Sequence, residues 1–74
     1  MEDREGYTIE LWDNIRNEWQ RSTFMWNRRY TEVRNEFDAL CADAKNAEML
    51  RKYRIVNTHS GIVYDEYANK EWAT

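Results

Sequence analysis

The stretch that dominates this chain runs from residue 12 to residue 47 and reads WDNIRNEWQRSTFMWNRRYTEVRNEFDALCADAKNA. Every seventh position in it is apolar, and these positions hold Trp12, Trp19, Trp26, Val33, Leu40 and Ala47. A second row, three or four residues away, contains Ile9, Arg16, Thr23, Tyr30, Phe37 and Ala44. Neither glycine nor proline interrupts the stretch. A repeat of seven is typical of a helix with one apolar seam, so the stretch predicts helix packing through large side chains.

We therefore expect a mainly α (α+β) fold in which a long heptad-patterned helix, or an antiparallel helical hairpin, covers about residues 8–50. A continuous helix of ~40 residues would be a rod of about 60 Å, which favours a coiled coil or a bend near residues 27–29. Side chains shrink along the seam from tryptophan to alanine. Since close packing sets large residues against small ones, the pairing should be antiparallel, within a hairpin or between two copies in a homodimer. The predicted core comprises Trp12, Ile15, Trp19, Trp26, Tyr30, Val33, Phe37, Leu40 and Ala44.

The last third of the chain has a different character. Residues 52–57 (KYRIVN) and 62–67 (IVYDEY) are rich in β-branched and aromatic side chains, and residues 57–61 (NTHSG) have turn chemistry. This pattern predicts a small β-hairpin near 52–67, and a helix over 62–73 is the alternative. Residues 1–6 should be a flexible lead and 68–74 a tail, so that 1–74 forms a single small domain.

Size and composition limit the function classes. A chain of 74 residues buries only roughly 60% of its unfolded surface, so oligomerisation or a partner is the expected additional stabiliser. Cys41 is the sole cysteine and His59 the sole histidine, which excludes an internal disulfide and a four-ligand zinc site. Apolar runs are too short for a membrane span, and the charged start is not a signal peptide. A cytoplasmic protein without membrane contact is the expectation, and a net charge of −3 does not favour a nucleic-acid binder.

The sequence contains no motif for catalysis or cofactor binding, so we expect neither an enzyme nor a resident cofactor or metal. The leading hypothesis is a protein–protein interaction module that binds and regulates or inhibits a larger protein complex. The triplet at residues 24–26 points in three directions around a helix, which leaves part of it outside the seam, and the edge of the hairpin could add a strand to a partner's sheet. The candidate partner-binding residues are Phe24, Met25, Arg28, Arg29, Arg54, Tyr64 and Tyr67.

Two alternatives remain open. The chain could be a self-assembling structural coiled coil whose seam has no partner but its own copy. It could also have a nucleic-acid-linked role. Arg28, Arg29 and the basic residues at 51–54 could contact phosphates, or the six acidic residues among positions 1–20 could mimic them.

Overall fold

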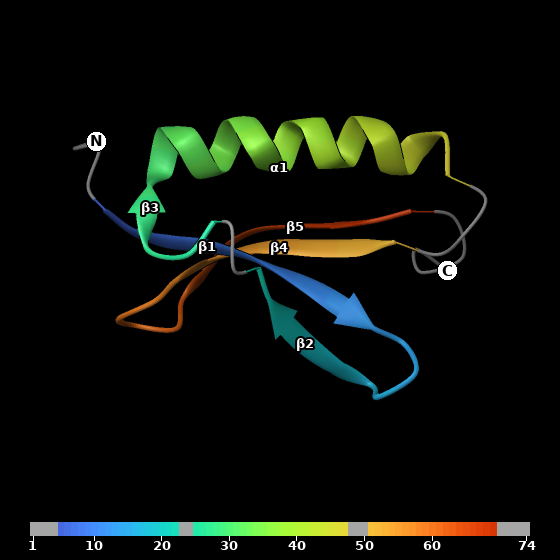
Figure 1. Ribbon diagram of the computed structural model, residues 1–74, viewed down its shortest axis with the longest axis horizontal. Helices are drawn as coiled ribbons and strands as arrows, with labels where there is room; N and C mark the ends of the chain where they lie inside the picture. The colour runs from blue at the N-terminus through green and yellow to red at the C-terminus, as the bar shows by residue number, and fades with distance from the viewer. Residues whose placement is uncertain (1–4, 23–24, 48–50, 70–74) are drawn as a thin grey trace.

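The computed structural model describes residues 5–22, 25–47 and 51–69, and within these ranges five antiparallel strands form a sheet that carries one helix (Figure 1). The elements in chain order are β1 (Glu5–Asp13), β2 (Glu18–Arg21), β3 (Arg28–Arg29), α1 (Tyr30–Lys45), β4 (Lys52–Asn57) and β5 (Val63–Ala68). The order across the sheet is β2-β1-β4-β5, and β3 pairs with the start of β1. The helix lies along one side of the sheet, whereas the β1–β2 hairpin projects away from it (Figure 1).

The predicted long helix or helical hairpin over about 8–50 is wrong, and the coiled coil is wrong with it. Residues 5–13 and 18–21 are strands, and the helix covers only residues 30–45. Trp12 and Trp19 are direct cross-strand partners in an antiparallel hairpin. A spacing of seven places two residues on one side of a helix, but it also places them opposite each other in a hairpin whose turn lies midway between them. The heptad pattern therefore does not distinguish the two structures.

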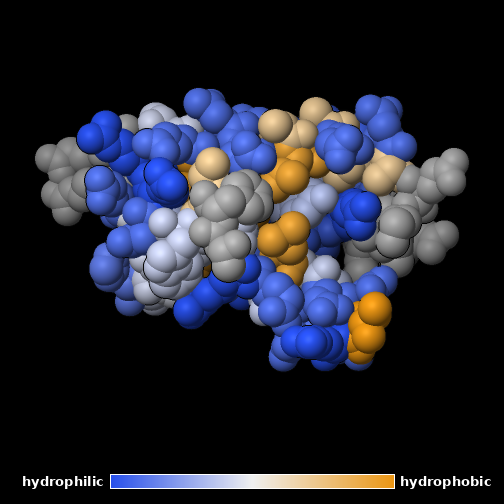
Figure 2. All heavy atoms as spheres, in the orientation of Figure 1, coloured by the Kyte–Doolittle hydropathy of each residue, from blue (hydrophilic) through white to orange (hydrophobic). Residues whose placement is uncertain are grey.

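The β1–β2 turn explains why the chain reverses where a helix was predicted. The Asp13 carboxylate accepts hydrogen bonds from the backbone N–H groups of Ile15 (2.9 Å) and Arg16 (3.2 Å), and Asn17 adopts a left-handed φ of 56°. Such short polar side chains favour turns because they replace backbone hydrogen bonds locally. Ile15 lies on this turn and is 90% exposed, so its predicted place in the core is wrong. Figure 2 shows an apolar side chain at the far end of this hairpin.

The hydrophobic core lies between α1 and the sheet. Val33, Phe37 and Ala44 are buried on one face of α1, at the spacing of three and four residues that lines one side of a helix. The buried side chains of the sheet come from β1 and β4 and are Tyr7, Ile9, Tyr53 and Ile55. Half-buried residues surround this cluster, namely Leu11, Met25, Tyr30, Leu40, Cys41 and Tyr67. Alternate residues of a strand face opposite sides of a sheet, so Tyr7 and Ile9 meet the helix while their neighbours face away.

The three tryptophans of the heptad row do not belong to this core, contrary to the prediction. Trp12 and Trp19 are half-buried on the side of the sheet that faces away from α1, because Trp12 alternates with the helix-facing Leu11. Trp26 is 42% exposed and precedes β3. The helical part of the seam therefore packs against the sheet, and the strand part lies on the side of the sheet that faces away from α1.

The hairpin predicted near 52–67 corresponds to β4 and β5, which pair with Tyr53 opposite Tyr67. The alternative helix over 62–73 is wrong for Val63–Ala68, which form a strand. In the turn, the Asn57 side chain accepts hydrogen bonds from the backbone N–H groups of His59 and Ser60 at 2.9 Å, and Gly61 has a φ of +77°.

The predicted terminal segments are only partly described. Glu5 and Gly6 belong to β1 and are not part of a flexible lead, because β3 pairs with this end of the strand. The rest of that lead, residues 70–74 of the tail, and Phe24 lie outside the described residues. No helix in the described ranges has the length and apolar character needed to cross a bilayer.

Candidate functional site

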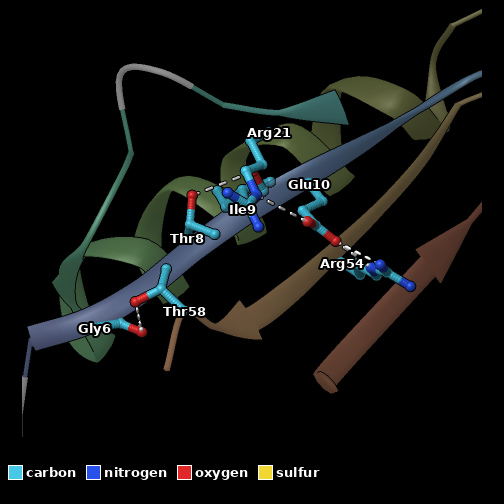
Figure 3. A network of polar contacts seen from close by, with 7 residues as sticks. All are labelled: Gly6, Thr8, Ile9, Glu10, Arg21, Arg54 and Thr58. Atoms are coloured by element: carbon cyan, nitrogen blue, oxygen red, sulfur yellow. Dashed lines mark hydrogen bonds and ion pairs between the residues drawn. The ribbon is translucent and has the colours of Figure 1, made fainter. Parts of the chain in front are cut away.

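The side of the sheet away from α1 is covered by no described helix or strand, and we call it the open face. Its members come from β1, β2, β4 and β5 and comprise Thr8, Glu10, Trp12, Trp19, Arg21, Lys52, Arg54, Val56 and Glu66. Figure 3 shows part of this group, with α1 behind the sheet and Arg21, Glu10 and Arg54 side by side on β2, β1 and β4. Most of these residues are polar or aromatic, unlike the apolar face under the helix.

A row of alternating charges crosses the open face from edge to edge. The strand registers place Arg21 opposite Glu10, Glu10 opposite Arg54, and Arg54 opposite Glu66. Arg54 Nε donates a hydrogen bond of 2.6 Å to Glu10 Oε1, and Arg54 Nη2 lies 2.6 Å from the same oxygen in an ion pair. Arg21 Nε lies 3.8 Å from Glu10 Oε2. Glu10 is only 9% exposed, and a buried carboxylate needs such partners to remain charged. Glu10 is therefore the fixed centre of the row (Figure 3).

An aromatic row lies beside the charged one. The rings of Trp12 and Trp19 meet edge to face, with centroids 5.4 Å apart. Lys52 Nζ lies 5.2 Å from the Trp12 ring and 5.4 Å from the Trp19 ring, and the Arg54 guanidinium lies 4.1 Å from the Trp19 ring. Cations over tryptophan faces are attracted by the ring quadrupole, so the contacts of Lys52 and Arg54 with the two rings restrict the side chains of both rows.

Trp26 extends the open face beyond the strands. The guanidinium of Arg21 lies 4.8 Å from its ring centroid. Between them and β4 is a recess of about 150 Å³, which is lined by Thr8, Glu10, Arg21, Trp26, Arg54, Val56, Asn57, Thr58 and Gly61. The open face thus combines three tryptophans with one polar recess.

The loops that border the recess are attached firmly to the sheet. Thr58 donates from its backbone N–H (2.7 Å) and from its hydroxyl (3.0 Å) to the carbonyl of Gly6 (Figure 3). A contact between the Thr58 hydroxyl and Asn27 Oδ1 at 3.1 Å joins the β4–β5 turn to the segment that carries Trp26. Gly6 permits this approach, because a Cβ there would lie 3.0 Å from His59.

The residues predicted to bind a partner do not form one site. Arg28 and Arg29 are exposed on β3 and line a separate shallow depression of about 360 Å³ with Glu5, Trp26, Asn27 and Glu32. Met25 and Tyr67 are half-buried against the core. Tyr64 is 43% exposed and its ring contacts those of Tyr7 and Tyr30, on the helix side. Arg54 alone of the described candidates lies on the open face.

Sequence reasoning did not select the other residues of this face. The sequence analysis placed Trp12 and Trp19 in the core. It considered Glu10 and Lys52 only as members of the acidic and basic groups of a nucleic-acid-linked alternative, and it did not select Arg21. A signal existed in residues 7–12 (YTIELW), where small-scale alternation of apolar and polar residues is typical of a strand with two different faces. The seven-residue spacing of the tryptophans favoured a helix and outweighed this strand pattern.

Groups with a displaced pKa lie on the helix side of the sheet. Burial, aided by the Asp38 carboxylate, raises the pKa of Cys41 to about 11 from its ordinary 9.0, so the thiol is protonated at neutral pH and is a poor nucleophile. A hydrogen bond to Asp65 raises the pKa of Arg34, and burial raises the pKa of Tyr53. These shifts follow from packing and ion pairing.

The described residues hold no group of three or more histidine, cysteine, aspartate or glutamate side chains placed to bind a metal ion. Compared with protein-family models, with curated proteins and with solved structures, the chain shows no match. The open face must therefore be interpreted from its own chemistry.

Proposed function

We propose that this chain is a small, non-enzymatic protein–protein interaction module of the cytoplasm, which binds and regulates or inhibits a larger protein complex through its open face. The observation that carries the proposal is the group of Trp12, Trp19 and Trp26 with Arg21 and Arg54 on one side of the sheet. Tryptophan and arginine dominate the energetics of protein interfaces, and the cation contacts hold this group in a fixed geometry.

Preorganisation supports this proposal. The cation contacts on Trp12, Trp19 and Trp26 and the Glu10–Arg54 pair restrict side chains before any partner arrives. Binding then orders fewer rotamers, and each long side chain that is already ordered saves about 0.5–1.5 kcal/mol on association.

A protein partner is favoured over nucleic acid because the cations of the open face already contact carboxylates and tryptophan rings. A single-strand platform offers aromatic faces for bases and a positive groove for the backbone. Here Arg54 binds Glu10, and Lys52 Nζ lies 3.7 Å from Glu66 Oε1. The rings of Trp12 and Trp19 also carry cations. Charge on the face is thus largely balanced, which suits a protein surface better than a polyanion.

Affinity capture with two matched variants tests the proposal. Trp26 and Tyr64 are aromatic and almost equally exposed, at 42% and 43%, but only Trp26 belongs to the open-face group. Tagged wild-type protein and Tyr64→Ser should retain the same partner from source-cell lysate, and Trp26→Ser should lose it. With the purified partner, Trp26→Ser should weaken the Kd about tenfold or more. Loss with Tyr64→Ser and retention with Trp26→Ser would place binding elsewhere.

A further inference from the structure

The recess on the open face has an uncompensated positive charge. Among the described residues that line it, Arg21 and Arg54 are cationic and Glu10 is anionic, so two positive charges face one negative charge. The remaining lining residues are neutral. Since opposite charge across an interface selects the partner, the recess is complementary to a single anionic group.

The two guanidinium groups are arranged to share such an anion. Arg54 is fixed by the hydrogen bond from Nε and the ion-pair contact from Nη2 to Glu10 Oε1, and its Nη1 makes neither kind of contact with Glu10. The Arg21 side chain is 66% exposed and lies 3.8 Å from Glu10, but the Trp26 ring at 4.8 Å restricts it. A guanidinium presents five N–H donors in one plane, so each arginine retains donors for a ligand oxygen.

The size and walls of the recess select the kind of anion. Its volume of about 150 Å³ suits one side chain. Chain-terminal carboxylates are usually captured by free backbone N–H groups. Here the N–H groups of Asn57, Thr58 and Gly61 already donate to the carbonyls of Ile62, Gly6 and Asn57. The donors that remain are on side chains, and they match the bidentate geometry of a carboxylate.

We propose that the recess between Arg21, Arg54 and Trp26 binds the side-chain carboxylate of a glutamate or aspartate residue of the protein partner. This inference rests on the proposed function and names the chemistry of the partner at that site. Arg21 and Arg54 hold the two carboxylate oxygens, and the Trp26 ring and Val56 contact the methylene groups that precede them.

Titration of the folded protein with two matched probes tests this inference. N-acetyl-glutamate N′-methylamide offers a side-chain carboxylate without charged termini, and N-acetyl-glutamine N′-methylamide is its neutral counterpart. In ¹H–¹⁵N spectra, the glutamate probe should shift the Nε–H signals of Arg21 and Arg54 and the indole N–H of Trp26 in a saturable manner. The glutamine probe should leave them unchanged.

Two variants with the same charge change supply the control. Arg21→Gln should weaken binding of the glutamate probe about tenfold or more, because a charge-assisted hydrogen bond is lost. Arg16→Gln removes an equally exposed arginine (70% for Arg16, 66% for Arg21) from the tip of the same hairpin, outside the recess, and should bind like the wild type. Unchanged backbone amide spectra show that both variants are folded.

Equal responses to the two probes, equal binding by Arg21→Gln and Arg16→Gln, or tighter binding of inorganic phosphate than of the glutamate probe would overturn the inference. The proposed function fails separately. If the probe does not bind while the captured partner still depends on Trp26, the interaction module stands and the carboxylate recess is wrong. If the probe binds but Trp26→Ser does not affect the partner, the carboxylate recess stands and the proposed interaction through the open face is wrong.

Discussion

Breaking the Glu10–Arg54 pair should destabilise the protein far more than breaking an exposed pair. Their side chains are 11% and 24% exposed, with a contact of 2.6 Å. Removing one member of a buried pair costs about 3–5 kcal/mol, so Arg54→Met, which keeps an unbranched apolar side chain but removes the guanidinium, should lose about 3 kcal/mol. Glu10→Gln keeps an acceptor oxygen and should lose about 2 kcal/mol. A domain of this length is stable by only about 4–11 kcal/mol, so each loss is large.

The double variant separates the pair from its surroundings. Glu10→Gln combined with Arg54→Met should lose about 3 kcal/mol, which leaves a coupling energy of about 2 kcal/mol. Urea unfolding followed by tryptophan fluorescence measures all four proteins. The exposed pair of Arg34 and Asp38, with side chains 38% and 58% exposed, is the control and should couple by less than about 0.5 kcal/mol. Additivity within about 0.5 kcal/mol at Glu10 and Arg54 would refute the reasoning.

Three further predictions concern the rest of the fold. Ile15→Ser should shift the free energy of unfolding by no more than about 0.5 kcal/mol, because Ile15 is 90% exposed. A larger loss of stability in urea unfolding would contradict the exposed position of Ile15 at the tip of the β1–β2 hairpin. Gly6→Ala should lose about 1–3 kcal/mol in the same assay, since the φ of +116° strains a side chain and the new Cβ would lie 3.0 Å from His59; adding His59→Ala should recover only part of it. The rate of Cys41 alkylation by iodoacetamide should rise up to about pH 11 in the folded protein but level off near pH 9 in urea, because burial raises the pKa of the thiol. The contribution of the neutral thiol to the free energy of unfolding is fully present below pH 9 and is lost as the pH rises through 11.

The helix was predictable from residues 33–44 alone. Val33, Phe37, Leu40 and Ala44 repeat at intervals of three and four, and no strand reading places them on one side. The same holds for the β4–β5 hairpin, since β-branched residues flank the NTHSG turn, which its own side chains stabilise. In both segments the local preference and the final packing agree.

Residues 5–21 could not be assigned in that way, because two periodicities fit them. The interval between Trp12 and Trp19 suits a helix and a hairpin equally, and Glu10, Arg16 and Gln20 are good helix formers. The choice is made by distant partners: β4 pairs with β1 from Tyr7 opposite Asn57 to Leu11 opposite Tyr53. Hydrogen bonds between residues more than 40 positions apart leave no mark in a local pattern.

The candidate site depends on those distant partners as well. Its residue types are visible in the sequence, but Arg21, Glu10 and Arg54 meet only because three strands lie in one register.

The sequence by itself determined a small chain rich in large aromatic residues, with a helical pattern that includes residues 33–44 and a hairpin near 52–67. Only the tertiary structure decided that residues 5–21 are strands, that Trp12 and Trp19 lie opposite each other, and that they face away from the helix. The physical reason is that a strand acquires its hydrogen bonds from its neighbours. A helix closes its own hydrogen bonds and therefore carries its signature locally.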